Sequence, residues 1–235
     1  MLKEKYYKYK PINNLIDLER LFEIIKYKKI YLPRFEQLND PFESYAYHVV
    51  TLTCGATLSN NLLRRSLSGD SLFQKIGILS LTKDCTNQTM WAMYANQFSG
   101  VCLCFENLKY AKPVNYLSSL QIKNLPVLDE ITYTEKTAKK SLMIKNKKWE
   151  HEKEYRILSK KDYYIMNENN IPFIILGHKL PKNISLAINL FCIENNIEVY
   201  KTYIDYINNK IRIIDYNYEP EFDGTKFDEK KEIKL

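Results

Sequence analysis

Three short apolar segments constrain the fold of this chain more than any other feature. They are "GILSLT" at 77–82, "VCLCF" at 101–105 and "PFIILG" at 172–177, and each begins at or follows a glycine or a proline. Short apolar runs bounded in this way are typical of strands buried in a sheet. The helical stretches lie between them without the regular alternation of a parallel βαβ sheet. We therefore predict an α+β fold, with helices packed against a mixed, largely antiparallel sheet.

Apolar residues at helical spacing mark the helices. Asn14 and Asn87 can each cap a helix through the side-chain oxygen, and Gly100 can end the second one. We predict helices at 14–28, 87–100, 135–148 and 183–196, and a weaker, mostly helical pattern from 44 to 75.

Alternation of residue types marks further strands. In "YYKYK", Tyr7 and Tyr9 alternate with Lys8 and Lys10, which gives the strand one charged face. We predict additional strands at 6–10, 30–32, 130–134 and 198–216, the last of them folded back at a turn near Asn208 and Asn209.

The stretch "KWEHEKEYRIL" at 148–158 places charged residues at alternate positions. In a strand, Glu150, Glu152, Glu154 and Arg156 would share one face, with Trp149 and the other apolar residues opposite. In a helix, Glu150 and Glu154 would be neighbours and Glu152 would lie on the far side. Because a helix would scatter the apolar residues around its circumference, we predict a strand.

Two interpretations of this charged face stay open. On an exposed antiparallel sheet, Arg156 would pair with Glu154 or a neighbouring strand and stabilise the fold only weakly. In a cleft, adjacent carboxylates could raise one another's pKa and supply a general base or an electrostatic stabiliser.

The length and net charge of the chain limit the class of protein to which it can belong. The chain has 235 residues, and we predict one domain from 1 to 217 followed by a loosely held tail from 218 to 235. The net charge of +7 fits an anionic ligand or nucleic acid as partner, or a solvated lysine-rich surface. No apolar segment is long enough to cross a membrane, no signal-peptide pattern opens the chain, and five cysteines make no even disulfide set. We expect a cytoplasmic protein without a membrane partner, and the oligomeric state stays open.

Other candidate residues carry weaker patterns. Asn39, Asp40 and Glu43 lie in "NDPFE", which is either an ordinary turn or a source of carboxylates for a cleft. Trp91 belongs to an aromatic helical stripe, a pattern more typical of a core than of a cofactor platform. The cysteines lack paired spacing and no phosphate-cradling glycine motif occurs, so we predict no metal site.

Several of these motifs, in this order, resemble the bacterial domain-of-unknown-function 2971 family. The resemblance covers roughly residues 6 to 215. Family members often carry histidines where this chain has Met93 and Phe98, which counts against histidine-dependent chemistry. The most specific pieces are Asn39-Asp40-Pro41 with Glu43, Met90-Trp91 with Tyr94, and Trp149-x-x-Glu152-x-Glu154-x-Arg156.

The order of motifs is also similar, more distantly, to that of ADP-ribosyltransferases. This resemblance implies a split β-core with Lys8 or Lys10 on the first strand, Ser80 and Thr82 on a middle strand, and Glu-x-Glu on a late strand. It implies NAD as the substrate, bound in addition by the aromatic residues Trp91 and Tyr94.

The same resemblance implies roles for the late strand. Glu152 or Glu154 would hold the ribose 2′-hydroxyl of NAD and stabilise the positive charge that develops as nicotinamide leaves, with Arg156 on the same face. The other glutamate would orient or deprotonate the acceptor.

Three functions follow from these observations. The first is an ADP-ribosyltransferase-like enzyme, a bacterial toxin or phage-defence effector that uses NAD. The second is a metal-dependent nuclease that holds Mg²⁺ through Asp40, Glu43 and the carboxylates of 150–154. The third is a non-enzymatic module that binds nucleic acid or protein, with the glutamate strand as a structural element.

Overall fold

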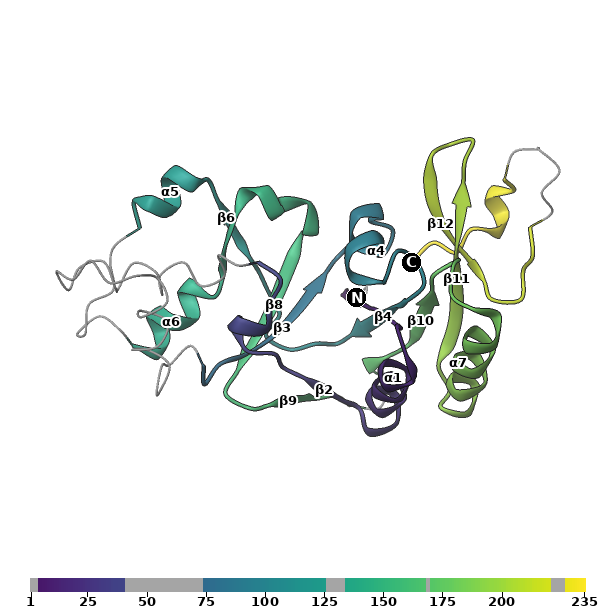
Figure 1. Cartoon of the computed structure of the whole chain (residues 1–235), viewed down its shortest axis with the longest axis horizontal. Helices are drawn as coiled ribbons and strands as arrows, with labels where there is room; N and C mark the ends of the chain where they lie inside the picture. The colour runs from purple at the N-terminus through teal and green to yellow at the C-terminus, as the bar shows by residue number, and fades with distance from the viewer. Residues whose placement is uncertain (1–3, 41–73, 126–133, 168–169, 221–226) are drawn as a thin grey trace. The chain divides into compact units, whose positions relative to one another are not determined.

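The chain divides into two compact units, each built from separate stretches of sequence. The computed structural model describes residues 4–40, 74–125, 134–167, 170–220 and 227–235 (Figure 1). The first unit comprises 1–29, 82–109 and 165–235, and the second comprises 30–81 and 110–164. Both units contain segments of the span 1–217, over which we predict a single domain from the sequence.

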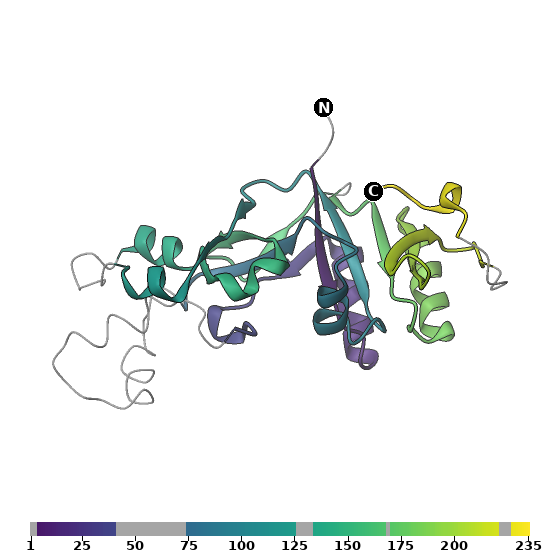
Figure 2. The ribbon, with the colours of Figure 1, turned by 90° about the horizontal axis from the view of Figure 1, so that it is seen from above.

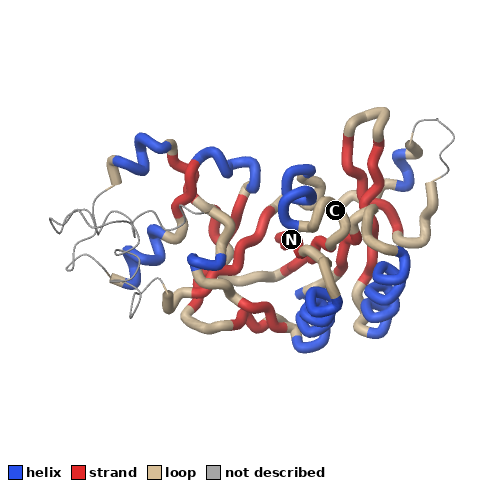
Figure 3. Tube along the Cα trace, viewed as in Figure 1, coloured by secondary structure: helices blue, strands red, loops and turns tan. Residues whose placement is uncertain are grey.

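Helices and strands occur together in both units, which confirms the predicted α+β class (Figure 3). In the first unit the strands follow the order β12-β11-β10-β4-β1. Strands β10 and β11 are parallel and are connected by helix α7, whereas the other neighbours in this order are antiparallel. The bounds are β1 Lys5–Lys10, β4 Val101–Glu106, β10 Phe173–Leu176, α7 Lys182–Glu194, β11 Glu198–Asp205 and β12 Lys210–Asp215.

The three segments that anchor the sequence prediction are strands with buried side chains. Val101 to Phe105 are all fully buried in β4, and the four residues of β10 are buried as well. Tyr7 and Tyr9 point from β1 into the same core, where they join Trp91. Lys8 and Lys10 alternate with these tyrosines, as predicted, but both are partly buried and Tyr6 on their side of the strand is buried as well.

Two helices of the first unit begin where asparagine caps them. Helix α1 (Leu15–Tyr27) starts after Asn14, whose side chain accepts a hydrogen bond from the Asp17 amide at 3.0 Å. Helix α4 (Gln88–Tyr94) starts after Asn87 in the same way. Helix α4 ends six residues earlier than predicted, because Asn96, Gln97 and Phe98 all have left-handed backbone angles that a helix cannot contain.

The last described residues lie against strand β12 (Figure 2). The Ile233 amide donates to the Ile213 carbonyl at 2.8 Å, and Arg212 pairs with Glu232 at 2.7 Å. A short 3-10 turn, η4 (Glu229–Lys231), precedes these contacts. The sequence predicts a loosely held tail over 218–235, and within it Glu232 and Ile233 make these ionic and backbone contacts.

The second unit contains short strands and short helices. Strand β8 lies between β3 and β5, while β6 pairs with β7 in parallel and β2 pairs with β9. Its core includes Phe35, Ile78 and Leu142. The elements are β2 Lys29–Tyr31, η1 Phe35–Gln37, β3 Gly77–Thr82, β5 Lys112–Pro113, β6 Asn115–Leu117, α5 Ser119–Lys123, α6 Glu135–Ser141, β7 Ile144–Asn146, η2 Lys147–Glu152, β8 Glu154–Ser159 and β9 Tyr163–Ile165.

Two predictions in this unit are wrong in part. The helix expected at 135–148 ends at Ser141, and β7 follows it. The strand expected over 148–158 begins only at Glu154, because residues 147–152 form the 3-10 helix η2 and Lys153 takes a left-handed conformation with φ 46°. The predicted strand at 130–134 and the predicted helical region at 44–75 lie largely outside the described residues.

Candidate functional site

Glu152 and Glu154 meet two cations inside the second unit. The Lys145 ammonium lies 2.5 Å from Glu152 Oε2 and 3.0 Å from Glu154 Oε2. Arg156 binds Glu154 through Nε at 2.7 Å and Nη2 at 3.0 Å. The four residues are between 1% and 7% exposed, so they form a buried network of two anions and two cations.

The local backbone explains why both glutamates point inward. Glu152 ends the 3-10 helix η2 and Glu154 begins strand β8, and the left-handed Lys153 between them turns the chain. Glu150 belongs to the preceding turn and is exposed. The three glutamates therefore do not share one strand face, although Glu152 and Glu154 still converge on Lys145.

Further hydrogen bonds fix the network in place. Arg156 Nη1 donates to the Leu142 carbonyl at 2.6 Å, and the Glu154 amide donates to the Tyr116 hydroxyl at 2.7 Å. Ser80 on β3 also hydrogen-bonds to the Glu154 side chain. Burial opposes ionisation of Glu154, but Arg156 and Lys145 outweigh that effect and lower its pKa to about 2.

This electrostatic state limits the chemistry that Glu154 can perform. A carboxyl group with a pKa of about 2 is fully ionised near neutral pH and is a weak base. Both of its oxygens are already bound to cations. Removal of one member of a buried ion pair destabilises a protein strongly, because the remaining charge is left uncompensated. These contacts therefore favour a structural role for Glu154.

Trp149 lies beside the network. The Lys145 ammonium is 5.0 Å from the centre of the Trp149 ring, and the ring of His151 lies 6.1 Å from the same indole. The contact with the lysine is a cation–π interaction that adds to the two carboxylate contacts. Trp149 thus lies in the same cluster as Glu152 and Glu154, whereas the strand interpretation placed it on the opposite face.

The other residues assigned to NAD binding lie in different surroundings. Of these, Ser80 joins the Glu154 network, whereas Lys8 and Lys10 lie on β1 in the first unit. Burial lowers the pKa of Lys10. Thr82, the last residue of β3, falls in the first unit, where it is buried and pairs with Tyr7.

Trp91 has a packing role in the first unit. Its side chain is fully buried, its indole N–H donates to the Cys85 carbonyl at 2.9 Å, and Tyr9 packs edge-on against it at 5.2 Å. Tyr94, also assigned to NAD, packs against the same core. These contacts favour the core interpretation of the aromatic stripe over the cofactor platform.

The turn motif "NDPFE" is only partly described. Asn39 is exposed and Asp40 is 5% exposed, while Glu43 lies outside the described residues. Within the described part of the chain, no group of three or more His, Cys, Asp or Glu side chains converges as a metal site would.

Burial raises the pKa of the Cys85 thiol to about 11, so this thiol is protonated near neutral pH.

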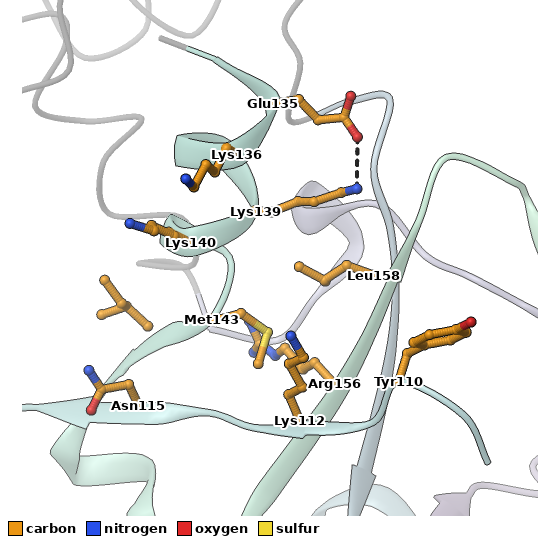
Figure 4. Close-up of a pocket in the computed structure, with 11 residues that line it drawn as sticks. Tyr110, Lys112, Asn115, Glu135, Lys136, Lys139, Lys140, Met143, Arg156 and Leu158 are labelled. Carbon is orange, nitrogen blue, oxygen red and sulfur yellow. Dashed lines mark ion pairs between the residues drawn. The ribbon is translucent and has the colours of Figure 1, made fainter. Parts of the chain in front are cut away.

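A pocket of about 940 Å³ opens on the second unit (Figure 4). Strands β5 and β8 form one side of it and helix α6 forms the other. Among the described residues that line it, the acidic one is Glu135, which pairs with Lys139 at 2.7 Å and with Lys160 at 2.6 Å. The basic lining residues are Lys112, Lys136, Lys139, Lys140 and Arg156.

The lysines of this pocket differ in their partners. Lys139 is paired with Glu135, and Arg156 is occupied by the buried network. Lys112, Lys136 and Lys140 have no carboxylate partner among the residues that the structure describes, and all three side chains are exposed. The pocket therefore presents positive charge that an anionic ligand could neutralise.

Apolar side chains complete the pocket wall. Met143, Ile144 and Leu158 line it beside the lysines, and Tyr110 stands at its edge with 77% of its surface exposed. Tyr110 has a φ of 71°, a left-handed conformation that non-glycine residues adopt only at a cost of about 1 kcal/mol. Such backbone outliers cluster at binding sites, which makes Tyr110 a candidate contact residue.

Sequence reasoning missed Lys145 and the pocket. Lys145 is one of several lysines in the stretch 136–148, and the residues beside it in the sequence do not distinguish it from the other lysines. Charge balance offered one signal: if Glu152 and Glu154 were both buried, Arg156 could neutralise only one, and a second cation had to come from elsewhere. The position of Lys112 in a strand could not be predicted, because this strand has only two residues, one of them a proline, and shows no periodicity.

No family model, curated protein or solved structure matches the chain. The resemblances to the domain-of-unknown-function 2971 family and to ADP-ribosyltransferases therefore stay predictions from the motifs alone. None of the helices in the described ranges is long and apolar enough to span a bilayer.

Proposed function

We propose that the chain binds a small phosphate-bearing ligand of the nucleotide type in the lysine-lined pocket of the second unit. The observation that carries this proposal is the excess of basic over acidic lining residues around a volume of about 940 Å³. Pockets that take small molecules and cofactors span roughly 300 to 1,000 Å³. A long nucleic acid would need an extended basic surface, whereas this cavity suits a compact anion.

The lysines of the pocket come from two elements. Lys136 and Lys140 come from successive turns of α6, so they lie on the same helix face, and Lys112 comes from β5 (Figure 4). Phosphate oxygens in the pocket would receive charge-assisted hydrogen bonds from these ammonium groups. Tyr110 and Leu158 offer apolar surface for a base or another ring at the same time.

In this proposal the buried network holds the two walls of the pocket together. Arg156 belongs to β8, and its guanidinium binds the carbonyl of Leu142, the residue that caps the end of α6. The same guanidinium is fixed by Glu154, which in turn binds Lys145. Glu152 and Glu154 thus act as positioning residues and do not contact the ligand.

Calorimetric titration tests this function with three probes: ATP, adenosine and orthophosphate. We expect ATP to bind, because it supplies both charge and a ring, and adenosine and orthophosphate to bind at least tenfold more weakly. Lys136→Gln combined with Lys140→Gln should weaken ATP binding by roughly tenfold or more, since hydrogen bonds to charged groups contribute about 1.5–3 kcal/mol each.

The matched control is Lys147→Gln combined with Lys161→Gln, which removes two exposed lysines of the same unit that do not line the pocket. It lowers the net charge by the same amount as the pocket variant without changing the cavity. Equal loss of affinity in the control and in the pocket variant would mean that ATP responds to overall charge, and the proposal would fail. Absence of ATP binding at millimolar concentration would also refute it.

ADP-ribosyl transfer is a second candidate, and the hydrogen bond between Ser80 and Glu154 favours it. A serine on a middle strand beside a glutamate on a late strand is the arrangement that the resemblance implies. Against it, Glu154 is 5% exposed and both its oxygens are engaged. Release of nicotinamide from NAD separates the two functions, because a binding module produces none above the uncatalysed rate.

A further inference from the structure

Helix α7 in the first unit carries an apolar face that no described residue covers. The inner face of this helix is buried through Ile188 and Cys192, and Phe191 stacks on Phe22 of α1 at 4.2 Å. The outer face exposes Leu186, Leu190 and Ile193 by 51%, 53% and 61%. Side chains four residues apart lie above one another on a helix, so Leu186 and Leu190 form part of one ridge.

The same ridge ends in opposite charges. Lys182 precedes Leu186 by four residues and Glu194 follows Leu190 by four, and both charged side chains are exposed. The ridge is therefore Lys182, Leu186, Leu190 and Glu194. A copy of this ridge running in the opposite direction would place Lys182 against Glu194 at both ends and Leu186 against Leu190 in the middle.

Both charges lie at the end of the helix where its dipole disfavours them. The amino end of a helix favours acidic side chains and the carboxyl end favours basic ones. Helix α7 has no acidic residue in its first turn, no basic residue in its last turn, and no side-chain cap at Pro181. Lys182 and Glu194 therefore do not serve the stability of their own helix. Lys201 binds the Glu219 carboxylate at 2.7 Å and lowers its pKa, and the charge of Lys182 adds to this effect.

We propose that helix α7 is a self-association surface, on which a second copy of this chain docks its own α7 in antiparallel orientation about a two-fold axis. The occupant is a second copy because the ridge is complementary to itself in both charge and apolar character. An interface of this kind is isologous, so each residue pair occurs twice. One helix face buries less surface than the 1,200–2,000 Å² of a standard stable interface, which predicts a weak, concentration-dependent dimer.

Sedimentation velocity on the full chain, from micromolar to submillimolar concentration, measures the association. Lys182→Glu creates two repulsive contacts per dimer, and so does Glu194→Lys, so each variant should raise the dimer dissociation constant by roughly tenfold or more. The exchanged variant Lys182→Glu/Glu194→Lys restores both attractive pairs and should associate like the native chain. Both single changes suit the helix dipole, so neither is expected to unfold α7.

Mixing the two single variants gives the sharpest test. Chains with Lys182→Glu and chains with Glu194→Lys repel themselves but complement one another, so an equimolar mixture should form a heterodimer at concentrations where each alone is monomeric. Leu190→Glu should abolish association, and Leu120→Glu, which changes an exposed leucine on α5 of the other unit, should leave it unchanged. A native chain that stays monomeric throughout, or a dimer indifferent to these charges, would overturn the proposal.

Discussion

At the scale of single residues, Lys145 is the side chain that explains the arrangement of the candidate site. Its ammonium binds both Glu152 and Glu154, whereas Arg156 binds Glu154. Burial of two carboxylates beside one arginine would leave one negative charge uncompensated, at a cost of several kcal/mol. The position of a lysine on the three-residue strand β7 is therefore a condition for burying the Glu-x-Glu motif.

Lys145→Met tests this condition. We expect the free energy of unfolding to fall by about 3–5 kcal/mol, because one partner of a buried ionic network is removed. The double variant Lys145→Met/Glu152→Gln should recover more than about 1 kcal/mol of that loss, since it also removes the stranded carboxylate. Urea denaturation gives the values, with Lys147→Met, an exposed neighbour, as control. Equal costs for Lys145→Met and Lys147→Met would rule the network out as a stabilising element.

The low pKa of Glu154 makes stability depend on pH. Its pKa falls from 4.5 in the unfolded reference to about 2 in the folded chain, so the native state binds fewer protons than the unfolded state in this range. The carboxyl group contributes on the order of 3 kcal/mol above pH 4.5, and that contribution is lost as the pH falls toward 2.

Denaturation at pH values from 6 to 2 measures this dependence. The native chain should lose stability steeply below pH 4.5, and Glu154→Gln should show a shallower slope than Glu150→Gln, whose side chain is exposed. Ion pairs with Lys139 and Lys160 also lower the pKa of Glu135 to about 2, and the comparison between the Glu154 and Glu150 variants leaves this contribution the same in both. Identical slopes in the two variants would contradict the assignment.

At the scale of secondary structure, sequence periodicity predicts the core strands correctly but does not predict the conformation of residues 147–153 at the candidate site. Runs such as "VCLCF" are buried on both faces, so a short apolar pattern is enough to identify them. Over 148–158 the charges alternate as in a strand, but Asn146 caps a 3-10 turn by accepting the Lys148 amide at 3.0 Å. The turn is stabilised by a residue outside the alternating stretch, so the alternation alone could not reveal it.

The close approach of two backbone segments explains why residue 177 is a glycine. A Cβ at Gly177 would lie 2.1 Å from the Phe98 carbonyl oxygen, and the Lys179 amide donates to that same oxygen at 3.0 Å. Gly177→Ala should therefore lower the free energy of unfolding by about 1–3 kcal/mol, as overpacking in a tight core does. Thermal denaturation followed by circular dichroism measures the change, and an unchanged melting temperature would refute the close packing of this turn.

At the scale of the whole molecule, the chain combines two units with separate tasks. The first unit holds the aromatic and cysteine core and the self-association helix α7, and the second holds the buried ionic network and the lysine pocket. The fold class and most core strands follow from the sequence, because burial patterns are local. The division into units does not, since each unit joins segments far apart in the chain. The pocket does not either, since its lysines come from α6 and from β5, more than twenty residues earlier.

The salt dependence of ATP affinity tests the central claim that free lysines in the second unit bind an anion. Affinity is measured by calorimetry from about 50 to 500 mM NaCl, a range over which screening of exposed charges increases several-fold. We predict that the native chain loses affinity steadily as salt rises, and that Lys136→Gln/Lys140→Gln binds more weakly with a shallower dependence. Equal affinity and equal salt dependence in the two proteins would contradict the account.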